Sequence, residues 1–201
     1  MLRGRLAALS TQEAAELSRR VVEQILTLPE FIAARTVLLF VPMASRHEVD
    51  LRPLIPRILA ARKSAALPRV DWPSRTITPQ AIANLDTDLE PDTQNPAPGL
   101  LQPRQDCPVI PASEIDLLLV PGLGFDEHGG RIGHGAGFYD RFLAQPSVRG
   151  VVCGVGLDIR VIGPRQRLPC DLHDRPVKML VTESRVLRFD RFSPAGHAAP
   201  G

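Results

Sequence analysis

The chain alternates between segments with helical apolar spacing and short, continuous apolar runs. Residues 11–28 carry apolar side chains at intervals that place them on one helical face: Ala15, Leu17, Val21, Val22, Ile25 and Leu26. Ser10 and Glu13 fit a capping box before this helix, and Pro29 is expected to end it. The run TVLLFVP at 36–42 is too short for a core helix, and it predicts a strand buried on both faces.

The rest of the chain repeats this alternation on either side of one irregular segment. Residues 71–111 are dense in Pro, Asp, Asn and Thr, and they predict loops with one short strand pair. The regular segments that we expect are a helix at 51–62, strands at 65–70, 115–120, 150–155 and 177–182, a glycine-rich loop at 121–135 and a short helix at 137–144.

Helices that alternate with fully apolar strands predict an α/β fold, in which a mainly parallel sheet is covered by helices on both faces. A length of 201 residues suits a single three-layer domain, which we assign to residues 1–187. Residues 188–201 are rich in Pro, Gly and Ala, and we expect them to form a loose tail.

Charge balance and cysteine content narrow the class of protein. The chain has 24 Lys and Arg residues and 22 Asp and Glu residues, which leaves a net charge of +2. This balance gives no sign of the basic surface that binds nucleic acid. Three cysteines without a C-x-x-C pair support neither a disulfide framework nor a zinc ribbon. Residues 1–10 lack the apolar core of a secretory signal, and no apolar run approaches the roughly 20 residues that cross a bilayer. We therefore expect a cytoplasmic protein that contacts no membrane.

Chemistry-bearing residues concentrate in the segment 116–143, DLLLVPGLGFDEHGGRIGHGAGFYDRFL. A buried strand there runs into glycines at 129, 130, 133, 135 and 137 and then into a helix, with Arg131 and His134 among the glycines. Glycine permits positive φ and close backbone approach, so successive N–H groups can converge on an anion beside the positive end of the helix dipole. The combination favours a phosphate-binding loop at the carboxyl ends of the strands, although a tight connection without a ligand would also use glycine.

This loop differs from the two commonest nucleotide-binding loops. No G-K-[ST] sequence is present, which excludes a Walker A loop. The glycines at 133, 135 and 137 alternate as G-x-G-x-G, so they do not match the dinucleotide fingerprint, and hydride chemistry on NAD has little support.

These residues resemble the 5-formyltetrahydrofolate cyclo-ligase (methenyltetrahydrofolate synthetase) family. That family has an apolar strand ending in P-G-hydrophobe-x-F-D, which matches 121–126, and then G-x-R-hydrophobe-G-x-G-x-G-[YF]-Y-D-R, which matches 129–141. Further segments that match in order lie at 2–10, 46–50, 67–70, 101–103, 168–174 and 181–183, so the resemblance covers residues 1–187. It implies a sheet like that of ribose-5-phosphate isomerase and the coenzyme A transferases.

The resemblance implies ATP-dependent closure of 5-formyltetrahydrofolate to 5,10-methenyltetrahydrofolate, with release of ADP and phosphate. In that family the formyl oxygen attacks the γ-phosphate, and the phosphate of the resulting imidoyl phosphate is expelled as N10 closes the ring. Phosphoryl transfer needs an in-line pose and positive charge from Mg²⁺, backbone N–H groups and guanidinium groups. We expect the chain to act as a monomer on this small-molecule substrate, with ATP and Mg²⁺ bound.

The resemblance also implies roles for individual residues. Arg131 and Tyr139 would be catalytic, Glu48 and Tyr139 would bind the folate, and Asp140 and Asp174 would hold Mg²⁺. Judged from the residues alone, Glu48 also fits an exposed acid that begins a helix, Tyr139 a core aromatic, and Asp140 a charge in a first helical turn. The residues expected to contact ATP are Arg3, Arg5, Gly130, Arg131, Ile132, Gly133, His134, Gly135, Ala136, Gly137, Phe138 and Tyr139.

The chain departs from the family pattern at four places. Ala136 stands where the family often has Lys or Gly, Ala7 where it has a basic residue, and Gln102 where it often has Glu. No Gln falls at the family's position after Gly156. These departures motivate an alternative hypothesis, a divergent or non-catalytic member that binds nucleotide or folate in a regulatory role. A sugar-phosphate or nucleotide-sugar enzyme on the same sheet is a third hypothesis, which rests on fold analogy alone.

Overall fold

Helix α2 is the first element in the computed structural model, which describes residues 9–43, 48–94, 100–133, 135–169 and 171–189. It spans Thr11–Leu26 and has the predicted capping box: the Ser10 hydroxyl accepts the Glu13 N–H at 3.2 Å, and the Glu13 carboxylate accepts the Ser10 N–H at 2.9 Å. The helix ends two residues before the predicted 28, because a separate short helix follows. That helix, α3, Pro29–Ala33, begins on a proline, which suits a position whose N–H has no intrahelical partner.

Seven strands form one sheet in the order β11-β10-β9-β6-β1-β2-β3. The five inner strands run parallel, and the edge strands β3 and β11 run antiparallel to their neighbours, so the mainly parallel sheet is confirmed. The strand predicted at 36–42 is shorter than expected, since its ladder stops at Leu38. The bounds are β1 Thr36–Leu38, β2 Ser64–Asp71, β3 Thr76–Ile82, β6 Leu117–Pro121, β9 Val151–Val155, β10 Met179–Val181 and β11 Val186–Arg188.

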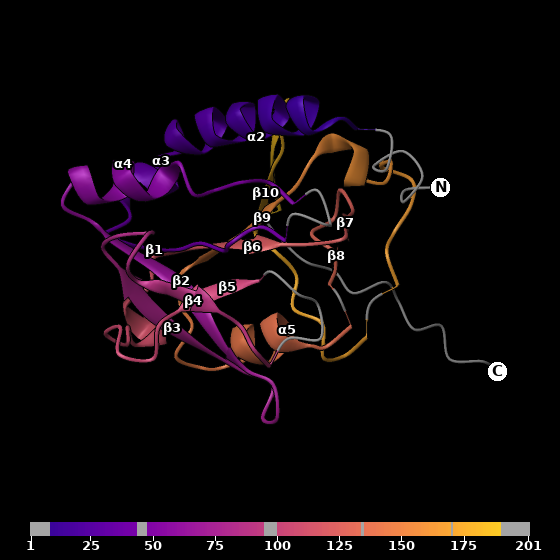
Figure 1. Cartoon of the computed structure of the whole chain (residues 1–201). Coiled ribbons are helices and arrows are strands. Elements are labelled where there is room, and N and C mark those ends of the chain that lie inside the picture. The colour runs from indigo at the N-terminus through magenta and orange to yellow at the C-terminus, as the bar shows by residue number, and fades with distance from the viewer. Residues whose placement is uncertain (1–8, 44–47, 95–99, 134, 170, 190–201) are drawn as a thin grey trace.

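Helices cover both faces of the sheet (Figure 1). Helices α2, α3 and α4, Leu54–Ala60, lie on one face, and α5, Phe138–Leu143, lies on the other. Successive strand residues point to opposite faces, so Leu119 of β6 packs in the cluster that includes α2 and α4, whereas Leu118 packs in the cluster that includes Phe142 of α5. Burial on both faces explains why the strands read as continuous apolar runs, and the three-layer α/β arrangement is confirmed.

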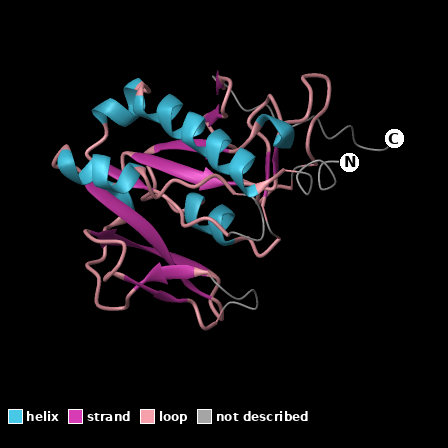
Figure 2. Cartoon of the chain, turned by 45° about the horizontal axis from the view of Figure 1, so that its top comes forward, coloured by secondary structure: helices cyan, strands magenta, loops and turns pink. Residues whose placement is uncertain are grey.

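The segment 71–111 holds more regular structure than predicted. Strand β3 pairs with β2 over seven residue pairs, and Figure 2 shows these two strands extending beyond the helices. Pro79 lies inside β3, and its carbonyl points away from β2 to accept the Ile110 N–H at 2.9 Å, so the missing proline N–H costs no bond to β2. The loop prediction for β3 was therefore wrong. The short strand pair is confirmed as β4, Leu89–Pro91, and β5, Leu101–Pro103.

The remaining elements are short. A hairpin of β7, Gly124–Phe125, and β8, Arg131–Ile132, lies inside the segment predicted as a glycine-rich loop. Two 3₁₀ turns, η2 and η3, span Ala112–Glu114 and Asp158–Arg160. Among the described residues, no helix is both long and apolar enough to cross a bilayer.

The carboxyl end of the described chain is paired structure rather than loose tail as far as residue 189. Strand β11 reaches Arg188, and the Phe189 N–H donates to the Lys178 carbonyl at 2.9 Å. The rest of the predicted tail, 190–201, lies outside the described residues.

The β7-β8 hairpin is anchored by the ring of Phe125, which is fully buried against three glycines. A Cβ added at Gly122, Gly154 or Gly156 would lie 2.7, 2.6 or 2.8 Å from an atom of this ring. Real Cβ atoms do not approach carbon so closely, so only glycine leaves room for the ring at these positions. The hairpin is thereby held against β6 and β9.

We expect Gly154→Ala to lower the free energy of unfolding by about 1–3 kcal/mol, because the new methyl group overlaps the Phe125 ring and has no space to move into. Gly163→Ala is the matched control, since no atom lies within 4 Å of a Cβ at that position, and it should change stability by less than about 0.5 kcal/mol. Urea unfolding of both variants measures the difference. Equal midpoints for the two would show that the ring is not confined.

Candidate functional site

A cavity of about 560 Å³ lies at the carboxyl end of the central strands. Its wall includes residues shortly after β1, the last residue of β6, the β2-β3 hairpin, the start of β5 and residues 131–133 and 135–140. Parallel strands direct their carboxyl ends to one edge of a sheet, which is where ligands of such sheets usually bind.

The cavity brings together most of the residues that the sequence singled out. Glu48 and Asp174 line it, although they are far apart in the chain. It is also lined by Arg131, Ile132, Gly133, Gly135, Ala136, Gly137, Phe138, Tyr139 and Asp140. Gly130 is not part of the lining, and Arg3, Arg5 and His134 lie outside the described residues.

Asp126 holds the loop that precedes Arg131. Its carboxylate is buried and accepts three backbone N–H groups: those of His128 at 2.9 Å, Gly130 at 2.7 Å and Leu168 at 2.9 Å. The Gly130 N–H is therefore occupied inside the protein rather than turned toward the cavity. Sequence reasoning gave Asp126 no role, although an Asp two residues before a backbone donor is the signal of an Asx turn.

Arg131 places a buried positive charge at the cavity. Its side chain is only 2% exposed, and its Nη2 contacts Asp140 Oδ1 at 2.6 Å. Nη1 donates to the Pro121 carbonyl at 3.4 Å, and the Tyr139 ring centroid lies 5.7 Å from Cζ. Its buried Nε has no hydrogen-bond partner within the described ranges. This guanidinium is fixed in orientation by Asp140, as a group that recognises a phosphate or carboxylate must be.

Two glycines of the glycine loop have the positive φ that glycine permits. Gly135 and Gly137 adopt φ values of 86° and 71°, a region that other residues rarely enter. The Arg141 Nη1 donates to the Ala136 carbonyl at 2.8 Å. The guanidinium of Arg141 therefore lies against the backbone of the loop at Ala136.

Two carboxylates at the cavity could hold a divalent cation together with a ligand's phosphates. Asp140 and Asp174 both line it. The Arg175 N–H donates to Asp140 at 3.3 Å, and the Asp171 N–H donates to Asp174 at 2.7 Å. Within the described part of the chain, no group of three or more His, Cys, Asp and Glu residues could hold a metal by itself. Mg²⁺ usually takes one or two carboxylates and shares them with phosphate oxygens and water, so both residues are candidates to hold it.

Glu48 and Tyr139 form a second polar group at the cavity. The Glu48 carboxylate accepts the Met43 N–H at 2.8 Å. Burial raises the pKa of the Tyr139 hydroxyl, and the negative charge of Glu48 raises it further. Tyr139 therefore stays a neutral hydroxyl that can donate a hydrogen bond.

Arg160 is a buried residue near this group that sequence reasoning missed. Its Nη1 donates to the Gly122 carbonyl at 3.0 Å. Burial lowers the pKa of its guanidinium, and the negative charge of Glu48 offsets only part of that effect. An arginine in a polar loop carries no pattern that predicts burial, so only the tertiary structure reveals it.

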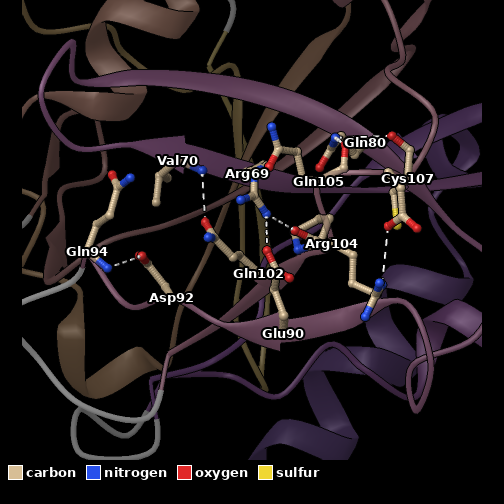
Figure 3. Close-up of polar contacts among 12 residues, drawn as sticks. Arg69, Val70, Gln80, Glu90, Asp92, Gln94, Gln102, Arg104, Gln105 and Cys107 are labelled. Atoms are coloured by element: carbon tan, nitrogen blue, oxygen red, sulfur yellow. Dashed lines mark hydrogen bonds and ion pairs between the residues drawn. The ribbon is translucent and has the colours of Figure 1, made fainter.

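The β4-β5 hairpin supplies a wall of the cavity that the sequence did not predict. Arg69 of β2 contacts Glu90 at 2.7 Å and also donates to the Pro103 carbonyl. The next residue, Val70, donates its N–H to the Gln102 side chain at 3.3 Å (Figure 3). These contacts hold the hairpin against β2, so that Gln102 and its neighbours face the cavity.

Comparisons with known proteins match the chain over most of its length. The model of the 5-formyltetrahydrofolate cyclo-ligase family matches residues 1–183. The chain is 30% identical over 191 residues to the 5-formyltetrahydrofolate cyclo-ligase of Escherichia coli (strain K12), which covers 92% of this chain and 98% of that protein. It is 28% identical over 152 residues to the 5-formyltetrahydrofolate cyclo-ligase of Mus musculus, covering 72% and 70% of the two chains.

Solved structures show the same fold. The NMR structure of Aquifex aeolicus 5,10-methenyltetrahydrofolate synthetase matches with a TM-score of 0.76 and 34% identity, over 98% of this chain and 93% of that one. The 5,10-methenyltetrahydrofolate synthetase from Mycoplasma pneumoniae matches with a TM-score of 0.67, over 90% and 93% of the two chains. At 20% identity, that second match supports the fold alone.

Tyr139 is the only tyrosine in the chain, so its ionisation can be measured directly. Because its pKa is raised, we expect no phenolate absorbance from the folded protein at about pH 10, where an unfolded tyrosine is half ionised. The folded chain then holds this proton more tightly than the unfolded chain, so the free energy of unfolding should fall as pH rises above about 10. Glu48→Gln should bring the pKa part of the way back. Ultraviolet titrations of folded and denatured protein that coincide would contradict this environment.

Proposed function

This chain belongs to the 5-formyltetrahydrofolate cyclo-ligase family, and we propose that it uses ATP to convert 5-formyltetrahydrofolate to 5,10-methenyltetrahydrofolate, releasing ADP and phosphate. The observation that carries the proposal is the buried guanidinium of Arg131, which shares one cavity with the glycine loop, Glu48 and Tyr139. A single cavity with a guanidinium and a glycine loop on one side, and a phenol and a carboxylate that can hydrogen-bond a folate, suits a reaction that joins a phosphate donor to an uncharged acceptor atom.

In the proposed reaction, the formyl oxygen attacks the γ-phosphorus of ATP and ADP leaves. N10 then attacks the formyl carbon and loses its proton, and the ring closes as inorganic phosphate leaves. The first step needs positive charge beside the phosphoryl oxygens and a fixed, in-line arrangement of the two substrates. Arg131, oriented by Asp140, would supply that charge without moving during the reaction. Backbone N–H groups of the loop 133–137 would contact the same phosphates.

Tyr139 and Glu48 would act on the folate. A phenol that stays protonated can donate a hydrogen bond to the formyl oxygen or to an adjacent substrate oxygen. The Glu48 carboxylate, held by the Met43 N–H, would accept hydrogen bonds from the pterin N–H groups. Both side chains would therefore orient the formyl group toward the phosphate side of the cavity.

Mg²⁺, when bound, would neutralise phosphate charge in this reaction. Asp140 and Asp174 would hold it. Asp140 would then have two roles, because the same carboxylate also orients Arg131.

The departure at Ala136, where the family often has Lys or Gly, motivates the alternative of a nucleotide- or folate-binding member without this activity, because alanine brings no charge to the loop. Arg131, the glycine loop, Glu48 and Tyr139 nevertheless share one cavity, so we favour the enzyme. The likeness of the sheet to that of ribose-5-phosphate isomerase and the coenzyme A transferases stays a prediction.

We expect purified protein to form methenyltetrahydrofolate from 5-formyltetrahydrofolate only when ATP and Mg²⁺ are both present. The product's near-ultraviolet absorbance gives the rate, and a phosphate assay gives the stoichiometry, which should be one phosphate for each ring closed. Nucleotide binding by calorimetry without any product would favour the regulatory alternative instead.

We expect Arg131→Lys to lower kcat/KM by about 100-fold, because lysine keeps the charge but loses the planar fork that Asp140 orients. Lysine is preferred to alanine because it leaves a cation beside Asp140 and so disturbs the fold less. Arg104→Lys is the control, since Arg104 pairs with Asp106 on the surface, and its kinetics should match those of the unmodified chain. Unchanged kinetics in Arg131→Lys, with normal thermal unfolding, would remove this guanidinium from the reaction.

A further inference from the structure

Trp72 is the only tryptophan in the chain, and it lies in the turn between β2 and β3 as part of the cavity wall. Its ring meets the ring of Phe138 edge to face, with centroids 5.0 Å apart and an angle of 79° between the planes. Phe138 begins α5, directly after the glycine loop. The indole therefore lies beside the helix that carries Tyr139 and Asp140.

The indole is also held at its polar edge. Its Nε1 donates to Asp92 Oδ2 at 2.9 Å, and the other oxygen of Asp92 accepts the Gln94 N–H at 3.0 Å. The side-chain oxygen of Gln94 in turn accepts the backbone N–H of Trp72 at 3.3 Å. Asp92 is only 6% exposed, and a carboxylate that loses water needs such donors to be stable. These contacts fix the ring in one orientation, which a tryptophan that merely filled a surface turn would not need.

The wall around Trp72 is mainly apolar, with Gln102 as its polar member. Val70, Ile77, Leu101 and Phe138 line the same cavity and come from the strands and the helix that surround the turn. The ionised groups Arg131, Asp140 and Asp174 come from the glycine-loop side and from the segment after 170. The cavity thus offers a charged region and a mainly apolar wall.

We propose that Trp72 is a specificity-determining residue that packs against the p-aminobenzoyl ring of the folate, and that Asp92 positions it. This inference rests on the proposed function and identifies which part of the substrate meets this wall. The p-aminobenzoyl ring has an apolar face with no hydrogen-bonding atoms in the ring, whereas the pterin and adenine rings have polar edges that need partners. A wall of aromatic and aliphatic side chains suits the p-aminobenzoyl ring.

The single tryptophan allows a direct binding test that does not depend on turnover. We expect 5-formyltetrahydrofolate alone to change the emission of Trp72 in a saturable way, because the ring becomes covered. A non-hydrolysable ATP analogue alone should leave the emission nearly unchanged. Absorption of light by the folate is corrected with N-acetyltryptophanamide at the same ligand concentrations. A response to the ATP analogue but not to the folate, or no response to either, would overturn the proposal.

Kinetics of variants give a second test. Trp72→Ala should raise the KM for 5-formyltetrahydrofolate on the order of tenfold and leave the KM for ATP within about twofold, and Trp72→Phe should recover most of the loss. Asp92→Ala should raise the same KM by a smaller factor and shift the emission maximum of Trp72. Ser74→Ala, on the same turn with its hydroxyl bonded to Asp71 and Thr76, is the matched control and should change neither. Equal effects on both KM values, or none, would contradict a role toward the folate.

The two proposals fail in different ways. Product formation with no emission response to the folate would reject the role of Trp72 and leave the enzyme activity intact. A saturable response to the folate with no product under any condition would reject the proposed function, and the role of Trp72 in folate binding would stand. If Trp72→Ala does not fold, the titration of the unmodified chain still decides the question.

Discussion

The fit of Phe125 against bare backbone determines where the candidate site can form. Its ring takes the space that side chains at Gly122, Gly154 and Gly156 would need, so the β7-β8 hairpin cannot shift along the sheet. Asp126, the next residue, collects three backbone N–H groups and shapes the turn. Two consecutive residues, one apolar and one charged, thereby fix the start of β8, where Arg131 stands.

Charge compensation follows from that position. A guanidinium at 2% exposure is stable only with a close partner, and Asp140 supplies it from the first turn of α5. The contact ties β8 to α5 across the glycine loop, so that loop is held at both ends. Its left-handed glycines, Gly135 and Gly137, then bend the chain between two fixed points. A site organised in this way would need little rearrangement to bind a ligand.

The opposite wall is built by a different kind of contact. Residues close together on β2 and its turn each contact the β4-β5 segment: Arg69 pairs with Glu90, Val70 with Gln102, and Trp72 with Asp92. All three contacts are polar and partly buried, and together they hold a hairpin that has little apolar core of its own. The mainly apolar wall of the cavity therefore depends on hydrogen bonds behind it, which relates the stability of this hairpin to its proposed role in binding.

The sequence by itself determined the layered fold and the identity of the glycine loop, because helical spacing, buried strands and glycine patterns are local signals. It also indicated Glu48, Arg131, Tyr139, Asp140 and Asp174, through a motif whose order in the chain is readable without structure. It could not reveal β3, where Pro79 hides the strand pattern, nor the burial of Asp126 and Arg160 or the contact between Trp72 and Asp92. Those depend on partners roughly 20 to 40 residues away, and only the folded chain brings such partners together.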